Sequence, residues 1–530
     1  MSEKKSLFWV LATLIILIFQ PIADYIAFNY YQASFSLLRN LLYLAGLICI
    51  SLIFVSILKT FFKKKSSLML ATAIGLYIMI LFNNYAVQDF LQNLLKENYK
   101  FRYLILLDFL AVPIVFIISS ILTKSKKVHN AFLLGIFGAS LVSLAMIKNQ
   151  DVNNHKFAIK EYTELATVAS SSSKKPNVYL IIPDMFVGPE FFNKHSIKPL
   201  IVTSELTKRS FKVVENAYSN ANATMLSLPQ VLSMNYLFED GDIIKGNKTT
   251  DLGKLYQHDN PVIREFKRRG YKFYRFADGM TSQCMGNEDK CIQKISLFKM
   301  QDIIFLNRTL IPSTIVHHFW ISKGLIPGQM EMNEFVPFLP NANEGPFFLL
   351  GHFSLPHPPY RFDEECRALP DPSAFNPTPS GFASRTPQER FNVTKGQILC
   401  AEKMLITFID GILNKDKEAI IIVQADHGIR AFFDPYATDF KDMTQENYNE
   451  SFNILYAFYG PEALKNYIYD GLSPVNSFRL VFGWLDNKEP ELLNHRSFFG
   501  KPTEDKMEKV GVYYVLHEWK NNSSEQDVIN

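Results

Sequence analysis

The residues Gln424-Ala425-Asp426-His427-Gly428 follow the apolar run Ala419-Ile420-Ile421-Ile422-Val423, and this stretch decides the fold class. The run is short, β-branched and preceded by charged residues, which is typical of a buried strand in a parallel sheet. Open α/β sheets bind ligands at the carboxyl ends of their strands. An aspartate and a histidine there offer an oxygen and a nitrogen to a divalent metal ion. Alternatively, the aspartate caps a turn in which the glycine adopts a positive φ.

The N-terminal part of the chain has a very different composition. Overall, 48% of the 530 residues are hydrophobic, but five long apolar segments lie before Asn149. Each is close to the length of about 20 residues that crosses a bilayer as a helix. The first is too long for the core of a cleaved signal peptide. We therefore predict an all-α transmembrane domain over residues 1–148, with five spans at 8–28, 37–60, 68–88, 103–123 and 131–148.

Lysine placement predicts the orientation of these spans. Lysines gather before the first span, after the second and after the fourth, at positions 4–5, 63–65, 124 and 126–127. The positive-inside rule then places the N-terminus in the cytoplasm, and five crossings export everything after Lys148. The expected location is the bacterial cytoplasmic (inner) membrane, multi-pass, with a periplasmic or extracellular C-terminal domain. The net charge of +4 mostly reflects this topology, so we expect no nucleic-acid partner.

Four of the five cysteines belong to the exported part: Cys284, Cys291, Cys366 and Cys400. An even number in an oxidising compartment favours two disulfides. Among the three possible connectivities we predict Cys284–Cys291 and Cys366–Cys400. A four-thiolate zinc site is the alternative, but it is disfavoured because the chain has no Cys-x-x-Cys spacing.

The exported part reads as a polar tether over 149–175 followed by an α/β domain over 176–530. Apolar strands and periodic helices alternate along this domain, as in a doubly wound, mostly parallel sheet. The expected strands are 177–183, 211–218, 271–276, 347–351, 419–423 and 452–459, and the expected helices begin at 224, 261 and 395.

Polar residues follow several of these elements. Asp184 ends the strand 177–183 and is either a metal ligand or a helix cap. Thr224 begins a helix, where its hydroxyl is either the N-cap or a nucleophile activated by a metal ion and the helix dipole. His352 and His357 follow the strand 347–351, where they could bind substrate or metal.

Taken together, these segments resemble the alkaline phosphatase superfamily, on its sulfatase-like, membrane-anchored branch. Phosphoethanolamine transferases and lipoteichoic acid synthases belong to that branch. The resemblance rests on motifs that occur in the family's order behind a membrane anchor, over about 176–485. They are Asn177-Val178-Tyr179-Leu180-Ile181-Ile182-Pro183-Asp184, Thr224-Met225-Leu226-Ser227-Leu228-Pro229, His352 with His357, Asp426-His427-Gly428, and Ser473-Pro474-Val475-Asn476-Ser477-Phe478-Arg479.

The resemblance implies an alkaline-phosphatase-like fold and a site. Asp184, Thr224, Asp426 and His427 would bind one divalent metal ion, zinc or manganese. Thr224 would attack phosphorus and carry the covalent intermediate, while His357 would touch the transferred group or its leaving oxygen. His352 would be a core histidine or would serve a second metal ion.

Two departures from the family pattern concern the metal. Phosphoethanolamine transferases carry a further histidine about a dozen residues beyond Asp-His-Gly, but the stretch 429–436 here has none. The resemblance therefore implies one metal ion and leaves a second metal site open. The first acid is Asp184, whereas these transferases and synthases commonly use glutamate there.

The function implied is a membrane-anchored, metal-dependent transferase of a phosphoethanolamine or phosphoglycerol group. Its donor would be a membrane phospholipid, and its acceptor a lipid-linked or envelope-glycan substrate. One alternative is a phosphatase or sulfatase that hydrolyses its ester. A formylglycine sulfatase is disfavoured, because formylglycine forms from Cys or Ser and position 224 is Thr. Another is a catalytically inactive envelope assembly or transport factor, which the presence of Thr224, Asp426 and His427 disfavours.

Overall fold

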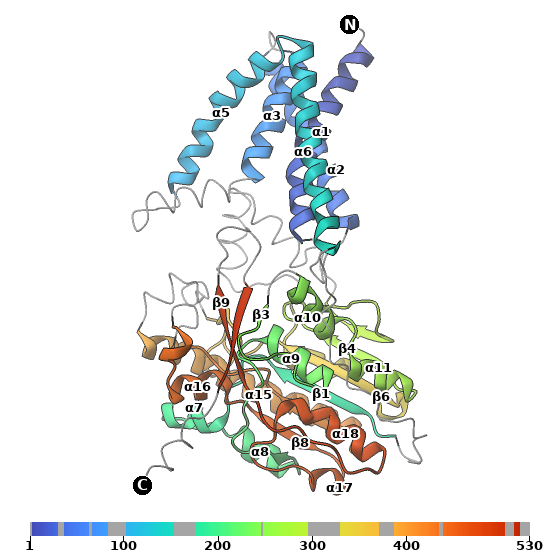
Figure 1. The fold of residues 1–530 in the computed structure, drawn as a ribbon, viewed down its shortest axis with the longest axis vertical. Helices are drawn as coiled ribbons and strands as arrows, with labels where there is room; N and C mark the ends of the chain where they lie inside the picture. Colours follow the sequence, from blue (N-terminus) through green and yellow to red (C-terminus); the bar gives the residue numbers. More distant parts are fainter. Residues whose placement is uncertain are drawn as a thin grey trace. The chain divides into compact units, whose positions relative to one another are not determined.

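The computed structural model describes residues 3–29, 37–62, 66–82, 102–152, 175–244, 247–294, 329–369, 386–433, 438–503 and 513–519. The chain divides into two compact units (Figure 1). Helices α1, α2, α3, α5 and α6 belong to the first unit, and strands β1–β10 with their surrounding helices belong to the second. Most of the predicted tether, 153–174, lies outside the described residues, as does 370–385.

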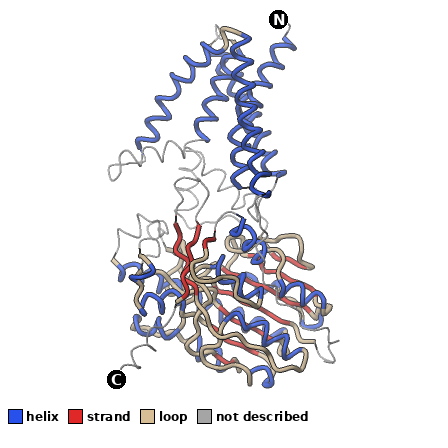
Figure 2. The backbone as a smooth tube through the Cα atoms, viewed as in Figure 1, coloured by secondary structure: helices blue, strands red, loops and turns tan. Residues whose placement is uncertain are grey.

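The secondary structure of the first unit consists of helices, joined by a short turn between α5 and α6 (Figure 2). Helix α1 packs against α2, α3 and α6. Three helices are long and apolar enough to cross a membrane, over Leu7–Asp24, Asn40–Phe61 and Lys126–Ala145, and two shorter apolar stretches are Ser67–Phe82 and Leu110–Leu122. The all-α prediction is confirmed, and the count of five spans remains a prediction. The helices are α1 Glu3–Asn29, α2 Leu37–Phe61, α3 Ser67–Phe82, α5 Arg102–Leu122 and α6 Lys126–Val152.

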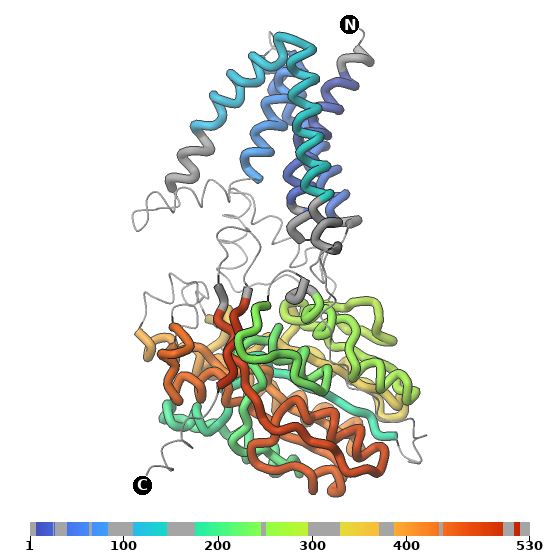
Figure 3. The backbone as a smooth tube through the Cα atoms, in the orientation of Figure 1, coloured from blue at the N-terminus to red at the C-terminus, as the bar shows by residue number. Residues whose placement is uncertain are grey.

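The second unit is built around a seven-stranded sheet, in the order β2-β8-β7-β1-β6-β4-β5. Strand β1 pairs in parallel with β6 and β7, and β4 pairs in parallel with β6 and β5. Only β8 runs antiparallel to its neighbours. Adjacent central strands come from distant parts of the chain, as the sequence colouring in Figure 3 shows. The strands are β1 Val178–Pro183, β2 Lys212–Val213, β4 Lys272–Ala277, β5 Lys290–Ile292, β6 Phe347–Phe353, β7 Ile420–Gln424 and β8 Tyr456–Tyr459.

Helices cover both faces of this sheet. Phe266 of α11 stacks on Phe348 of β6, with ring centroids 4.5 Å apart, and Phe408 of α15 packs against Phe353 of the same strand at 5.3 Å. Residues 348 and 353 point to opposite faces because side chains alternate along a strand. The predicted doubly wound, mostly parallel sheet is therefore confirmed.

The remaining helices of this unit connect the strands. They are α7 Pro189–His195, α8 Val202–Lys208, α9 Thr224–Ser233, α10 Asn247–Gln257, α11 Pro261–Arg268, α15 Pro387–Lys415, α16 Gln445–Phe452, α17 Glu462–Lys465 and α18 Ser477–Leu485. Short 3-10 turns lie at η3 Met332–Phe338, η4 Ala342–Glu344, η6 Phe440–Asp442 and η7 Pro474–Asn476.

A small antiparallel sheet supports the start of α9. Strands β3 Ile243–Ile244, β10 Tyr513–Glu518 and β9 Phe498–Thr503 form it in that order. The side-chain amide of Asn222 joins β9 to the segment before α9, because it accepts from Gly500 N at 2.8 Å and donates to Gly500 O at 3.2 Å. The sequence analysis did not predict this sheet.

Two predicted strands are shorter than expected. Of the stretch 211–218, only Lys212–Val213 is a strand, and it forms the sheet edge by pairing with Phe458 and Ala457 of the short strand β8. The stretch 452–459 begins as the end of α16, and its strand starts at Tyr456. Backbone pairing at a sheet edge depends on a partner far away in sequence, so the apolar pattern alone overestimated both lengths.

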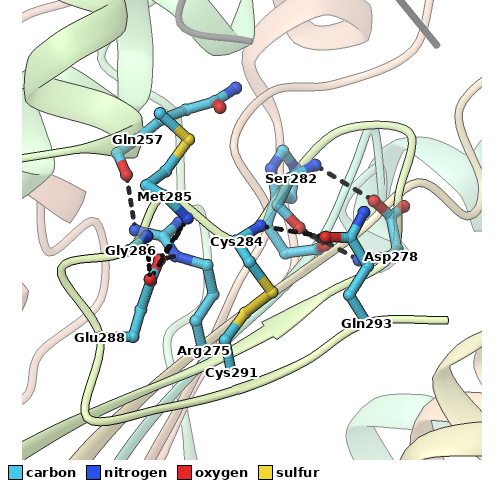
Figure 4. The surroundings of a disulfide bond; sticks show 11 residues. Gln257, Arg275, Asp278, Ser282, Cys284, Met285, Gly286, Glu288, Cys291 and Gln293 are labelled. Carbon is cyan, nitrogen blue, oxygen red and sulfur yellow. Dashed lines mark hydrogen bonds and ion pairs between the residues drawn. A yellow bond between two sulfur atoms is a disulfide. The ribbon is translucent and has the colours of Figure 1, made fainter. Parts of the chain in front are cut away.

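Both predicted disulfides are present, with S–S distances of 2.04 Å for Cys284–Cys291 and 2.10 Å for Cys366–Cys400. Figure 4 shows the first of them beside a buried ion pair. Arg275 Nε lies 2.7 Å from Glu288 Oε1, and both side chains are almost completely buried. Glu288 also accepts backbone N–H groups from Met285 and Gly286, so its carboxylate holds the backbone of the disulfide loop.

Candidate functional site

The ends of three adjacent strands bring the predicted site residues together. Asp184 follows β1, Asp426 follows β7 on one side of β1, and His352 lies near the end of β6 on its other side. The register pairs Ile182 with His352 across β1 and β6, and Ile181 with Val423 across β1 and β7. Because parallel strands end at one edge of the sheet, the three side chains meet there.

Asp426 is the most heavily bonded of these carboxylates. Its Oδ1 accepts the backbone N–H groups of Met185 at 3.0 Å and His427 at 2.9 Å. Its Oδ2 accepts the hydroxyl of Thr224 at 2.6 Å. Complete burial by itself would raise the pKa of Asp426, but His427, His352 and these hydrogen bonds outweigh it and lower the pKa.

Asp184 is buried beside Asp426 with less compensation. Burial and the negative charge of Asp426 raise its pKa well above the usual value. Its Oδ1 has no hydrogen-bond partner in the structure, and His427 Nε2 lies 3.8 Å from it. Asp184 does not cap α7, whose N-cap is Gly188. The capping alternative for Asp184 is therefore wrong, and its carboxylate faces the cluster.

Thr224 does not cap its helix either. The N-cap of α9 is Ala223, with no side-chain hydrogen bond, and Thr224 is the first helical residue. Its Oγ1 instead donates to Asp426 Oδ2 and lies 3.5 Å from His427 Nε2. The hydroxyl thus points into the cluster of carboxylates and imidazoles. Helix capping therefore does not explain why a threonine stands at this position.

The loop before Thr224 is held by the late family-like segment. Asn220 donates to Ser473 Oγ at 2.8 Å and accepts from Val475 N at 2.9 Å, and all three residues are buried. The segment 473–479, which contributed to the family resemblance, thus holds the loop that carries Thr224 in place.

His352 presents one bare nitrogen to the two carboxylates. The hydroxyl of Tyr256 donates to Thr281 O at 2.8 Å, so the Nδ1–H of His352 donates to the Tyr256 oxygen. Nε2 then carries a lone pair and lies 3.6 Å from Asp184 Oδ2 and 4.0 Å from Asp426 Oδ2. Among the described residues it has no hydrogen-bond partner. A lone pair among carboxylate oxygens is repulsive unless a cation lies between them.

These residues fit a divalent metal ion. Asp184, His352 and Asp426 each offer one ligand atom, and the three atoms lie within 4.8 Å of one another. Oxygen and imidazole ligands suit zinc or manganese, and the two unpaired buried atoms, Asp184 Oδ1 and His352 Nε2, would be satisfied by a cation. Two roles were left open for His352, a core histidine or a residue at a metal site, and this arrangement favours the metal site. The position of His352 follows from its pairing with Ile182 across β1 and β6, which a single sequence does not reveal.

His357 lies at the margin of this cluster. Its Nδ1–H donates to Pro358 O at 2.6 Å, and Gln397 Nε2 fixes its backbone carbonyl at 2.9 Å. Burial lowers its pKa to about 4, with further contributions from the positive charges of His427 and Arg430. Within the described residues, no hydrogen bond joins His357 to Thr224 or Asp426, so it is near the site without being part of the hydrogen-bonded group.

The glycine of Asp426-His427-Gly428 is needed for close packing. A Cβ on Gly428 would lie 2.1 Å from Glu450 O, and the Gly428 N–H donates to Ser451 O at 2.8 Å. Gly428 does not have a positive φ. The turn alternative, which predicted a positive φ at this glycine, is therefore wrong. Glycine is needed at position 428 because the backbone of Glu450 and Ser451 leaves no room for a side chain.

Glu450 holds the loop that follows this glycine. Its Oε1 accepts the N–H groups of Ala431 and Phe432, the latter at 2.7 Å, while Oε2 has no partner. Glu450 is 1% exposed, and this burial raises its pKa to about 8. The side chain is therefore neutral over much of the physiological range.

We predict that Glu450 makes stability fall with rising pH. Between about pH 4.5 and 8 the folded chain keeps a proton that the unfolded chain has released, so unfolding becomes easier by up to about 1.4 kcal/mol per pH unit. Glu450→Gln keeps the accepting oxygen and removes the titration. The melting temperature of the purified full-length variant should therefore fall less between pH 5 and pH 8 than that of the wild type. The exposed Glu462→Gln is the control, and identical pH profiles for wild type and Glu450→Gln would contradict the assignment.

A comparison with protein families matches the part of the chain that carries these site residues. The family profile described as Sulfatase matches residues 176–486. No curated protein matches the chain.

Several solved structures are similar to it. Integral membrane lipooligosaccharide phosphoethanolamine transferase A from Neisseria meningitidis shares 14% identity, over 92% of this chain and 97% of that one, with a TM-score of 0.36. The C-terminal periplasmic domain of phosphoethanolamine transferase EptC from Campylobacter jejuni shares 14% identity, over 59% and 90%, with a TM-score of 0.36. A 2-O GAG sulfatase shares 13% identity, over 63% and 79%, with a TM-score of 0.39.

Proposed function

This chain belongs to the sulfatase family, and from that premise we propose that it transfers a phospho group through a covalent phospho-threonine at Thr224. The group is a phosphoethanolamine or phosphoglycerol unit, the donor is a membrane phospholipid, and the acceptor is lipid-linked or an envelope glycan. One observation carries the proposal. The Thr224 hydroxyl lies 2.6 Å from Asp426 Oδ2 and 3.5 Å from His427 Nε2, where it caps nothing.

Asp184, Thr224, Asp426 and His427 would hold one divalent metal ion, with His352 Nε2 as a further neighbour. When bound, such an ion stabilises negative charge on the threonine oxygen and on the transferred group. The protein's own contribution is a rigid set of donors at three strand ends. Backbone N–H groups from Met185 and His427 orient Asp426, and Tyr256 orients His352.

The first half-reaction transfers the group to the protein. Thr224 Oγ1 forms a bond to phosphorus while the bond from phosphorus to the donor's leaving oxygen breaks. The threonine proton leaves toward Asp426 Oδ2, which already accepts its hydrogen bond. The leaving oxygen takes a proton from solvent and departs as the lipid alcohol, while Asp426 Oδ2 keeps the threonine proton.

The second half-reaction regenerates Thr224. The acceptor hydroxyl oxygen bonds to phosphorus and its proton passes to His357 Nε2, which then releases it to solvent. The bond from phosphorus to Thr224 Oγ1 breaks as that oxygen takes back the proton held by Asp426 Oδ2. His357 can accept the proton because its Nδ1–H is engaged with Pro358 O, which leaves a lone pair on Nε2. Over both halves, one ester bond is exchanged for another.

The membrane unit supports a lipid donor. Three apolar helices are long enough to cross a bilayer, and lysine placement puts the N-terminus in the cytoplasm. The catalytic unit would then act at the outer face of the inner membrane. A transferase must also keep water from the covalent intermediate, which water would otherwise hydrolyse.

The second candidate function is hydrolysis of a phosphate or sulfate ester, which the family match itself favours. Both reactions begin with the same attack and differ in whether water or an acceptor hydroxyl completes it. Thr224 disfavours a formylglycine sulfatase, because that modification begins from cysteine or serine.

One experiment tests the proposal. The detergent-purified full-length chain, loaded with zinc or manganese, is incubated with vesicles of phosphatidylethanolamine and phosphatidylglycerol, and its tryptic peptides are then weighed. We expect a phosphoethanolamine or phosphoglycerol adduct on the peptide that contains Thr224. An adduct on Thr224 only from 4-nitrophenyl sulfate or 4-nitrophenyl phosphate would favour the hydrolase, and a metal-loaded chain with no adduct from any donor would refute the covalent mechanism.

A further inference from the structure

We propose that Arg430 binds the charged oxygens of the ester group that Thr224 attacks. It is thus the anion-binding residue of this site, and its ligand is a tetrahedral phosphoryl or sulfuryl group. This inference rests on the proposed function, because it takes Thr224 as the attacking group. Nothing in the family motifs quoted above includes position 430.

The side chain of Arg430 lies beside the loop that carries Thr224. Its Nη2 donates to Asn222 O at 2.7 Å, two residues before Thr224. Asn222 is itself fixed, since its amide makes two hydrogen bonds to Gly500 of β9. One edge of the guanidinium is therefore anchored close to the attacking hydroxyl, and other N–H groups of the same fork remain to bind a ligand.

Arg430 lacks the counterion that other arginines of this unit have. Arg209, Arg269, Arg275, Arg361 and Arg496 each form an ion pair with at least one carboxylate. In the part of the chain that the structure describes, no carboxylate forms an ion pair with Arg430, although the residue is partly buried. A partly desolvated cation without a partner is costly unless an anion comes from elsewhere.

The backbone on both sides of Arg430 is held in place. Before it, Gly428 N donates to Ser451 O. After it, Ala431 and Phe432 donate to the carboxylate of Glu450, and Ala431 O accepts from Arg390 Nε at 2.6 Å. These contacts fix the position from which the side chain starts, so little conformational entropy is lost when it binds a ligand.

Arg430 is tied to the catalytic cluster by its place in the chain and by Asn222. It lies three residues after His427, and its hydrogen bond to Asn222 O holds one edge of the guanidinium beside the segment that leads to Thr224. A planar guanidinium can bind two oxygens of a phosphate at once, which suits the transferred group.

Binding of inorganic phosphate to the zinc-loaded, detergent-purified full-length chain tests the inference, with isothermal titration as the readout. Arg430→Gln removes the charge and should weaken phosphate binding by about 10- to 100-fold, as expected for a lost charge-assisted hydrogen bond. Arg430→Lys keeps the charge without the fork and should weaken it by several-fold. Arg367→Gln, an exposed arginine paired with Asp363 and Glu365, is the matched control and should bind like the wild type.

Zinc content and kinetics separate the possible outcomes. All variants should retain the wild-type amount of zinc, and Arg430→Gln should also form the Thr224 adduct more slowly. Unchanged phosphate affinity in a zinc-loaded Arg430→Gln chain would overturn the role of Arg430 while leaving the covalent mechanism intact. Loss of zinc from Arg430→Gln would overturn it in favour of a structural role.

Two further outcomes complete the test. If Arg430→Gln does not fold, Arg430→Lys decides, and unchanged phosphate affinity in that variant overturns the inference. A wild-type chain that holds no zinc in zinc-replete buffer would refute the proposed function, and the role of Arg430 with it. Titration of inorganic sulfate against the same variants distinguishes a sulfuryl from a phosphoryl ligand, because the preferred anion should show the larger loss on Arg430→Gln.

Discussion

Thr224→Ala is expected to abolish turnover, by at least about a thousandfold, while the protein still folds and keeps most of its metal. The reason is geometric. Within the described residues, the short hydrogen bond of this hydroxyl runs to Asp426 Oδ2, and the N-cap of α9 is Ala223, which makes no side-chain hydrogen bond. Removing the hydroxyl therefore costs the helix no cap, and the loss of one hydrogen bond should cost about 1–2 kcal/mol of stability. Asp184, Asp426 and His427 remain to hold the ion.

Activity, melting temperature and metal content of the full-length variant check this prediction together. Thr224→Ser keeps an oxygen at the same place and is the matched control, so it should retain part of the activity and form the adduct on serine. A fully active Thr224→Ala enzyme would refute the covalent mechanism, whatever the metal content.

Asp426→Asn should have an effect of similar size on activity, but through the metal. The carboxylate of Asp426 is completely buried, receives Thr224 on Oδ2 and lies within reach of His427 and His352. An amide cannot supply the negative charge that compensates a divalent cation in a buried site. Most of the bound metal should therefore be lost, together with turnover.

Metal analysis after dialysis of the full-length protein measures this loss directly. Asp416→Asn is a matched control. Asp416 is also a buried carboxylate, but it precedes β7, at the end of the strand away from Asp426, and accepts a hydrogen bond from Asn177. It should keep the wild-type metal content. An Asp426→Asn chain with full metal occupancy would contradict the ligand assignment, and would leave Thr224 as a separate question.

The two variants differ in a way that separates nucleophile from ligand. In Thr224→Ala, activity should fall much further than metal content, whereas in Asp426→Asn both should fall together. Parallel losses in both variants would mean that Thr224 contributes mainly to metal binding.

The sequence alone determined the layered architecture of the second unit and its central strands. Runs such as 177–183 and 419–423 are apolar on both faces, which only a strand covered by helices on both sides can bury. Asp184 and Asp426 could be placed at the same edge of the sheet because parallel strands end together. The disulfide pairs also followed from cysteine number, compartment and local spacing.

Only the tertiary structure decided which side chains meet. Thr224 had two roles consistent with its position in sequence, and the choice depended on Asp426, which lies 202 residues away. The position of His352 depended on the pairing of its strand with β1 and on its hydrogen bond to Tyr256. The position of the Arg430 side chain depended on its hydrogen bond to the carbonyl of Asn222. Local propensity and periodicity report the burial of one segment, whereas a catalytic cluster is set by strand order, register and long-range hydrogen bonds, which no single segment encodes.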